Sequence, residues 1–166
     1  ARLYEKRIKH AQTPGDRVRL RLDLAKVLEE RSRDSKAAQA ALEAAFSDDP
    51  TDADSYLRIS QIYRQQRDFA KAREANDKAR ALDPNSVEIR YNEVNLLEAE
   101  GKNAEAINLM KEILASTAKK TYNPAERGNR SALLERLGFM YRNSEQFGPA
   151  VETFRQIAEL DPDLAA

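Results

Sequence analysis

Three Asp-Pro pairs divide this chain into segments of related length. They stand at Asp49–Pro50, Asp83–Pro84 and Asp161–Pro162. The first two prolines are 34 residues apart, and the last two are 78 apart, which is two periods of 34 with ten extra residues. A period of 34 closed by a proline is typical of helix-turn-helix repeats that stack on one another. The spacing therefore predicts a repeat protein, an architecture that usually provides a binding surface.

Residues that favour helices dominate the segments between the prolines. Ala, Leu, Glu, Arg and Lys are abundant, whereas the chain has only 5 glycines and 6 prolines. This composition predicts an all-α fold. Together with the period, it predicts a right-handed alpha-alpha superhelix, a solenoid of stacked helix-turn-helix repeats.

Composition also excludes several classes of function. Lys and Arg number 28 and balance 28 Asp and Glu, so bulk charge favours neither nucleic acid nor a membrane surface. The chain has no cysteine, and His10 is its single histidine, which leaves no thiolate, no disulfide and no histidine pair for a metal. There is no glycine-rich phosphate loop. We therefore expect no catalytic residue, no cofactor and no metal site.

No apolar run approaches the ~20 residues of a membrane span, and the N-terminus lacks the apolar core of a signal peptide. We expect a soluble chain, with the cytoplasm slightly favoured and no compartment established.

The clearest helix pair lies near the C-terminus. Bulky, small and aromatic side chains recur there at i, i+3, i+4 and i+7, which places them on one helix face, and a second face follows before the closing proline. These positions are occupied by Leu134, Leu137, Gly138, Tyr141, Ala150, Phe154 and Pro162. This series resembles the tetratricopeptide repeat at every spacing. The resemblance implies stacked helix pairs and a role in binding other proteins.

The resemblance extends over about four and a half repeats. We expect one domain over residues 1–166, with a lone helix at 1–13. Repeats follow at about 16–50, 52–84, 86–118 and 124–162, and an insertion lies at 121–130. The half-repeat at the N-terminus and the lack of a polar capping helix at the C-terminus predict a fragment of a longer protein.

Local signals refine the helix boundaries. Asn123 can cap a helix and Pro124 suits its first turn, so we expect one long helix from Pro124 to about Asn143. Thr51 with Asp54 resembles a capping box. Residues 14–16, Pro-Gly-Asp, are expected to stop the N-terminal helix.

Three small or polar positions bear on how the repeats pack. Gly138 and Ala150 are small where two helices must cross closely. Asn76 stands where the family usually has an aromatic residue, so its helix pair is expected to pack more loosely.

The family resemblance implies that the first helix of each repeat lines a concave groove. The residues expected there are offset by one or two positions from the packing stripe. They are Arg58, Gln61, Arg64, Tyr91, Asn92, Asn95, Arg136, Phe139 and Arg142. The same face of the third repeat also carries Glu98.

These residue types favour a protein or peptide partner. Arginine and aromatic side chains dominate binding hot spots, and amides both donate to and accept from a peptide backbone. We expect the arginines to hold acidic groups of the partner. Tyr91 either lines the groove or packs against the next repeat. Phe139 is expected in the groove, because Met140 and Tyr141 already fill the packing face.

A chaperone-tail clamp known in this family is not expected here, because its two lysine positions are occupied by Leu57 and Ala132. Three other functions stay open. The chain could self-assemble into homo-oligomers through its C-terminal helix, since no further helix is expected to pack on Phe154 and Ile157. It could be an RNA-binding helical repeat, although nucleic acid is the less favoured partner. It could also be a non-catalytic segment of a larger enzyme or regulator.

Overall fold

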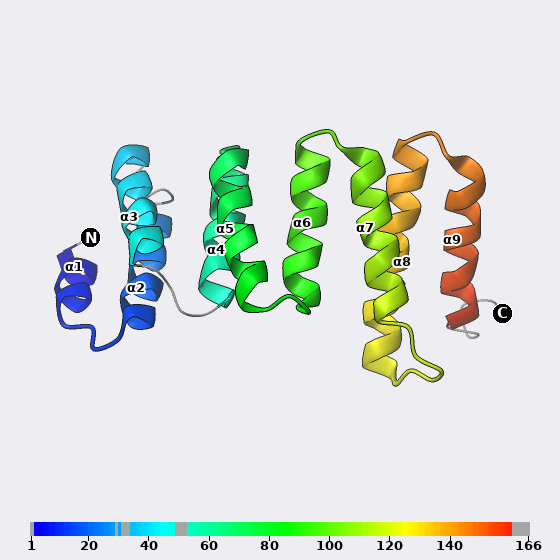
Figure 1. Cartoon of the computed structure of the whole chain (residues 1–166), viewed down its shortest axis with the longest axis horizontal. Coiled ribbons are helices and arrows are strands. Elements are labelled where there is room, and N and C mark those ends of the chain that lie inside the picture. The colour runs from blue at the N-terminus through cyan, green and yellow to red at the C-terminus, as the bar shows by residue number, and fades with distance from the viewer. Residues whose placement is uncertain (1, 29, 31–33, 49–52, 161–166) are drawn as a thin grey trace. The chain divides into compact units, whose positions relative to one another are not determined.

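The structure is a computed structural model and describes residues 2–28, 30, 34–48 and 53–160. All regular elements in these ranges are helical (Figure 1). Their bounds are α1 Arg2–Lys9, α2 Pro14–Val27, α3 Ser35–Ser47, α4 Ala53–Gln65, α5 Phe69–Leu82, α6 Val87–Ala99, α7 Asn103–Ser116, α8 Pro124–Asn143 and α9 Phe147–Leu160.

The chain divides into two compact units, residues 1–92 and 93–166. The boundary falls inside α6, so this helix contributes its first half to one unit and its second half to the other. Within the units, α2 packs on α3, α4 on α5, and α8 on α9. Sequential helices that pair in this way are expected of helix-turn-helix repeats. The prediction of one domain over the whole chain stays a prediction.

The first unit shows where the N-terminal boundaries were predicted wrongly. Residues 14–16 do not merely stop a helix, because α2 begins at Pro14. The side chain of Thr13 caps it by accepting a hydrogen bond from the backbone N–H of Asp16 at 3.1 Å. Proline suits the first turn of a helix because its missing N–H would have no partner there. The lone helix is accordingly shorter than residues 1–13 and ends at Lys9.

Helix α2 is apolar on several sides. Val18, Leu20, Leu22 and Leu24 are all buried although they alternate along the sequence. The reason is that α2 has three neighbours, α1, α3 and α4. A helix surrounded in this way buries more than one stripe.

Helix α8 confirms the long helix predicted from Asn123 and Pro124. It runs from Pro124 to Asn143, and its first turns, yellow in Figure 1, extend past the end of α9. Asn123 forms a complete capping box with Glu126. The Asn123 side chain accepts from the Glu126 N–H at 2.9 Å, and the Glu126 carboxylate accepts from the Asn123 N–H at 3.0 Å.

Side chains secure the insertion that precedes α8. Lys119 forms an ion pair with Glu126 at 2.7 Å. Arg130 donates to the carbonyl oxygen of Leu114 at 3.0 Å and lies over the ring of Tyr122. The hydrogen bonds from Lys119 and from the Asn123 backbone hold the pKa of the Glu126 carboxyl below its usual value.

Three interhelical turns share one backbone geometry. Arg67, Gly101 and Glu145 have φ angles of 63°, 78° and 59°. Each follows a helix and closes it with two hydrogen bonds, for example from Gly101 N to Glu98 O at 3.0 Å and from Lys102 N to Leu97 O at 2.8 Å. This is the αL-terminated end that helices often adopt. Arg67 and Gly101 are 34 residues apart and Gly101 and Glu145 are 44 apart, so the period of 34 and the insertion of 10 predicted from the prolines recur in the backbone.

The close crossing predicted at Gly138 is confirmed. A Cβ atom built on Gly138 would lie 2.6 Å from the Phe154 ring. Ala150, on the facing helix, is 4% exposed. Glycine therefore lets Phe154 lie directly on the α8 backbone. The pairs at 49–50 and 161–162 and the cap at Thr51 lie outside the described residues.

Candidate binding surfaces

The predicted groove residues fall into both compact units. Those of the first unit are Arg58, Gln61, Arg64, Tyr91 and Asn92. Those of the second unit are Asn95, Arg136, Phe139 and Arg142. Each set is described within its own unit.

The first unit has a hollow of about 300 Å³ between the first helices α2 and α4. Two predicted residues, Arg58 and Gln61, lie in its wall. Among the described residues, the lining consists of Leu22, Asp23, Lys26, Glu30, Arg58, Gln61, Ile62 and Gln65. Side chains of both charges, two amides and two apolar groups therefore surround one cavity. We call it the α2–α4 hollow.

Arg58 remains accessible at this hollow. Its side chain is 53% exposed, and the Asp23 carboxylate is 3.9 Å from its Nη2 atom. That distance is long for a hydrogen bond, and an ion pair this exposed contributes little to stability. The guanidinium can therefore turn toward a ligand at small cost.

Arg64 and Tyr91 are half-buried and do not line the hollow. The Nε atom of Arg64 is buried, and the described residues offer it no hydrogen-bond acceptor. Both alternatives for Tyr91, groove and packing, stay predictions.

Asn92 corrects one part of the predicted groove. It is 2% exposed and lies in the interior of the first unit. Its amide nitrogen donates to Ser60 Oγ at 2.8 Å and to Asn76 Oδ1 at 3.0 Å. Ser60 in turn donates to the Ala72 carbonyl at 2.7 Å. The prediction that Asn92 lines an open surface was wrong. The side chain is buried, and buried amides are usually held by hydrogen bonds of this kind.

The same network changes the interpretation of Asn76. The sequence predicted loose packing where this residue replaces an aromatic. Asn76 is instead 1% exposed, and Asn92 reaches it across the helix pair. Hydrogen bonds therefore take over the role that an aromatic ring would have. No local pattern reveals this, because the partners are 16 and 32 residues apart.

In the second unit, Arg136 is held by a carboxylate of the chain itself. Its Nη2 atom donates to Oε2 of Glu98 in an ion pair, although the two residues are 38 positions apart. The side chain of Arg136 is 42% exposed and that of Glu98 is 23% exposed. Asn95, one turn before Glu98 on α6, is half-buried. The sequence placed Glu98 on the groove face but contained no signal for its pairing with Arg136.

Phe139 and Arg142 follow Arg136 at three-residue steps along α8. Phe139 is 37% exposed, so the predicted exposure is partial. Its ring meets Phe154 edge-on with 5.5 Å between centroids, and the Arg142 guanidinium lies 4.8 Å from its centre. Residues spaced in this way are neighbours on a helix surface. We call Glu98, Arg136, Phe139 and Arg142 the α8 cluster.

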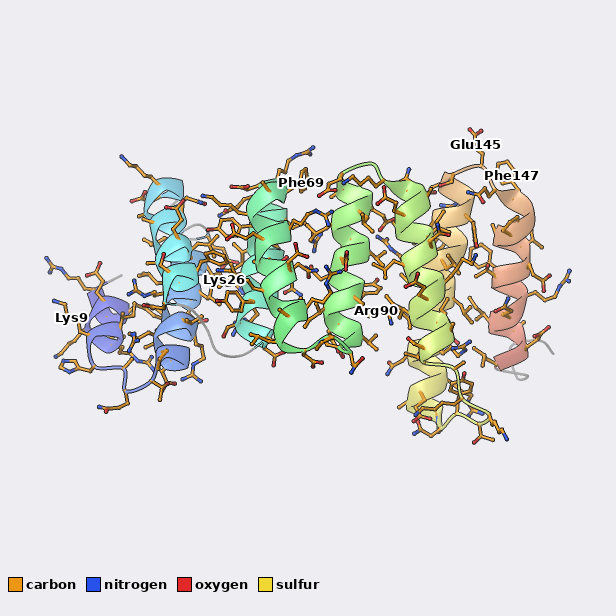
Figure 2. All side chains as sticks on the ribbon, in the orientation of Figure 1. Lys9, Lys26, Phe69, Arg90, Glu145 and Phe147 are labelled. Atoms are coloured by element: carbon orange, nitrogen blue, oxygen red, sulfur yellow. The ribbon has the colours of Figure 1, made fainter. Side chains whose placement is uncertain are left out.

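Figure 2 shows the side chains of both units. Its labelled Glu145 and Phe147 stand at the turn between α8 and α9. Among the described residues, no group of His, Asp and Glu side chains could hold a metal ion. In the same part of the chain, no helix is both long and apolar enough to cross a membrane.

The sequence matches the tetratricopeptide repeat in three stretches, residues 22–87, 64–125 and 132–164. The chain belongs to the tetratricopeptide repeat family. Repeats of this family are typically non-catalytic scaffolds for protein interaction. Among curated proteins, none matches the sequence.

Solved structures show the same fold. The crystal structure of MamA is 19% identical with a TM-score of 0.69, covering 99% of this chain and 88% of that one. The tetratricopeptide-like repeats of a putative kinesin light chain from Podosopora anserina are 17% identical with a TM-score of 0.75, covering 98% and 86%. YrrB is 16% identical with a TM-score of 0.65, covering 96% and 75%. These likenesses confirm the predicted all-α helical repeat fold.

Proposed function

We propose that this tetratricopeptide repeat chain is a scaffold that binds an extended peptide, or an extended segment of a partner protein, along the faces of its first helices. The α2–α4 hollow is the observation that carries the proposal. It is a cavity between two first helices, where the family resemblance puts the binding face.

The chemistry of the hollow suits a peptide. Gln61 and Gln65 can each donate to and accept from a peptide backbone. Ile62, which is partly exposed, offers apolar contact to a side chain of the peptide. Arg58 is more than half exposed and can pair with an acidic group. Sites that combine apolar walls with a few oriented polar groups are typical of ligand binding.

The α8 cluster supplies a comparable surface in the second unit. Phe139 is a partly exposed aromatic ring flanked by two arginines, and Arg and aromatic residues are enriched in binding hot spots. YrrB, which shares the fold, is described as a repeat protein with an unusual peptide-binding site. That description agrees with peptide binding as a use of this fold.

A random dodecapeptide library displayed on phage, selected against the purified chain, tests the proposal. Binding of each selected peptide is then measured with Arg58→Ala/Gln61→Ala. We expect this double variant to weaken binding at least about tenfold, the loss of a hot-spot residue. The matched control is Arg155→Ala/Gln156→Ala, which removes the same side chains from exposed positions on α9. Failure to select any peptide, or equal loss in both variants, would contradict the proposal.

A second candidate is self-association through α9. Phe147 and Val151 are 63% and 59% exposed on this helix, and large exposed apolar side chains often mark contact sites. Sedimentation of the chain over a range of concentrations tests this. A concentration-dependent oligomer that Val151→Glu abolishes would support it, and a strict monomer would exclude it.

A further inference from the structure

We propose that Glu98 occupies, in the unbound chain, the place on Arg136 that a carboxylate of the partner takes on binding. The inference rests on the proposed function and assigns a ligand chemistry to the α8 cluster. The partner segment would present a carboxylate to Arg136 and an apolar side chain to Phe139.

The ion pair has the character of an exchangeable contact. Arg136 has five N–H donors. Among the described residues it forms one hydrogen bond, to Glu98. Its Nε atom is buried without an acceptor. A guanidinium is best satisfied by two parallel bonds to one carboxylate. The Arg136 side chain is 42% exposed, so its remaining Nη N–H donors can be reached by a second carboxylate.

Other hydrogen-bond donors for the Glu98 carboxylate lie nearby. Its side chain lies in the wall of a hollow of about 210 Å³, whose other lining residues are Asn103, Met140, Asn143 and Ser144. Two amides and a hydroxyl in this lining are hydrogen-bond donors for a carboxylate. Rotation of the Glu98 side chain can thus move its carboxylate from Arg136 to neutral donors without leaving it unsolvated.

Breaking the ion pair between Arg136 and Glu98 costs little free energy. Both members of the pair are partly exposed, and ion pairs of this kind contribute little net stability. Replacement of the Glu98 carboxylate by a carboxylate of the partner leaves the charge beside Arg136 unchanged. Phe139, one turn further along α8, distinguishes a peptide from a small anion, because its partly exposed ring can pack against an adjacent apolar side chain.

The first experiment needs no peptide, and so it separates this inference from the proposed function. The Nε–H resonance of Arg136 is followed by ¹⁵N NMR, assigned with Arg136→Lys, while sodium acetate is added. In Glu98→Gln the acetate dissociation constant is expected to fall about two- to fivefold relative to wild type, as expected for removal of a weak competing ion pair. The control is Glu152→Gln, which removes the carboxylate of another surface ion pair, that with Arg155 at 3.1 Å. It should leave the Arg136 titration unchanged.

The second experiment uses the dodecapeptide library. Peptides selected on the wild-type chain are expected to be enriched in Asp, Glu or a C-terminal carboxylate next to an apolar residue. Arg136→Gln should remove this enrichment. Peptides with blocked C-termini separate side-chain from terminal carboxylates as the source.

The outcomes are distinguishable. An Arg136 resonance that ignores acetate in both wild type and Glu98→Gln overturns the inference, even if peptides bind. Acidic enrichment that survives Arg136→Gln overturns it as well. A normal acetate response with no selectable peptide would instead contradict the proposed function and leave Arg136 as a carboxylate site without a peptide partner.

Discussion

The side-chain amide of Asn92 donates a 2.8 Å hydrogen bond to the hydroxyl of Ser60, and both residues are buried. The bond joins the middle of α6 to α4 across 32 residues of sequence. With Asn76 it forms a polar contact inside an otherwise apolar core.

Asn92→Ala is expected to lower the free energy of unfolding by about 1–3 kcal/mol, because it leaves the buried Asn76 carbonyl oxygen without its donor. Urea denaturation measures the change. Asn108→Ala, at an exposed position of α7, is the matched control and should stay within about 0.5 kcal/mol of wild type. Equal effects of the two substitutions would show that the buried network contributes nothing.

Gly138→Ala should destabilise the second unit by about 1–3 kcal/mol, since the new methyl group would overlap the Phe154 ring. In the same helix, a Cβ atom built on Gly128 would have no other group within 4 Å, so Gly128→Ala should stabilise by up to about 1 kcal/mol. Opposite signs for the two glycines in chemical denaturation are the expected result. Adding Phe154→Leu should restore part of the loss at Gly138, and no recovery at all would argue against this contact as its cause.

The αL position at the α6–α7 turn makes Gly101→Ala costly although the site is open. A Cβ atom built on Gly101 would have no other group within 4 Å, but the φ of 78° is unfavourable for a residue with a Cβ, by about 1–2 kcal/mol. Glu145→Gly, at the corresponding position of the α8–α9 turn, should be neutral or stabilising. Thermal unfolding of both variants checks this, and a loss of stability in Glu145→Gly would contradict the shared geometry.

The capping box at α8 should make stability depend on acid pH. The pKa of Glu126 is lowered in the folded chain by Lys119 and by the Asn123 N–H. A lowered pKa means that the stabilisation is fully present above the unfolded value of about 4.3 and disappears as the pH falls through the folded value. Glu126→Gln should therefore lower the melting temperature at pH 7 and converge with wild type in acid.

The control for that titration is Lys119→Gln, which removes the largest cause of the shift. It should reduce the change of the melting temperature with pH, while the backbone hydrogen bond of Asn123 remains. A difference between wild type and Glu126→Gln that persists at a pH below the folded pKa would show that the charge of Glu126 is not responsible.

The repeat, the family and most helix ends follow from local patterns in the sequence. Proline spacing and the Asn123 cap act through neighbouring residues, whose geometry the helix period dictates. The sequence also located the close crossing at Gly138, because a small residue at a packing position has few other uses. The boundary at α1 was missed because Pro14 suits the start of a helix as well as the end of one.

Which polar residues of the first helices are open to a ligand depends instead on how the helices pack. Asn92 and Arg58 belong to the same predicted face, yet the first is buried in a network and the second is 53% exposed. Likewise, Arg136 is paired with Glu98 across 38 residues. The helix period fixes the direction of a side chain relative to its own axis. Which residue the side chain meets in that direction depends on a neighbouring helix. The position of that helix is set by packing rather than by local sequence.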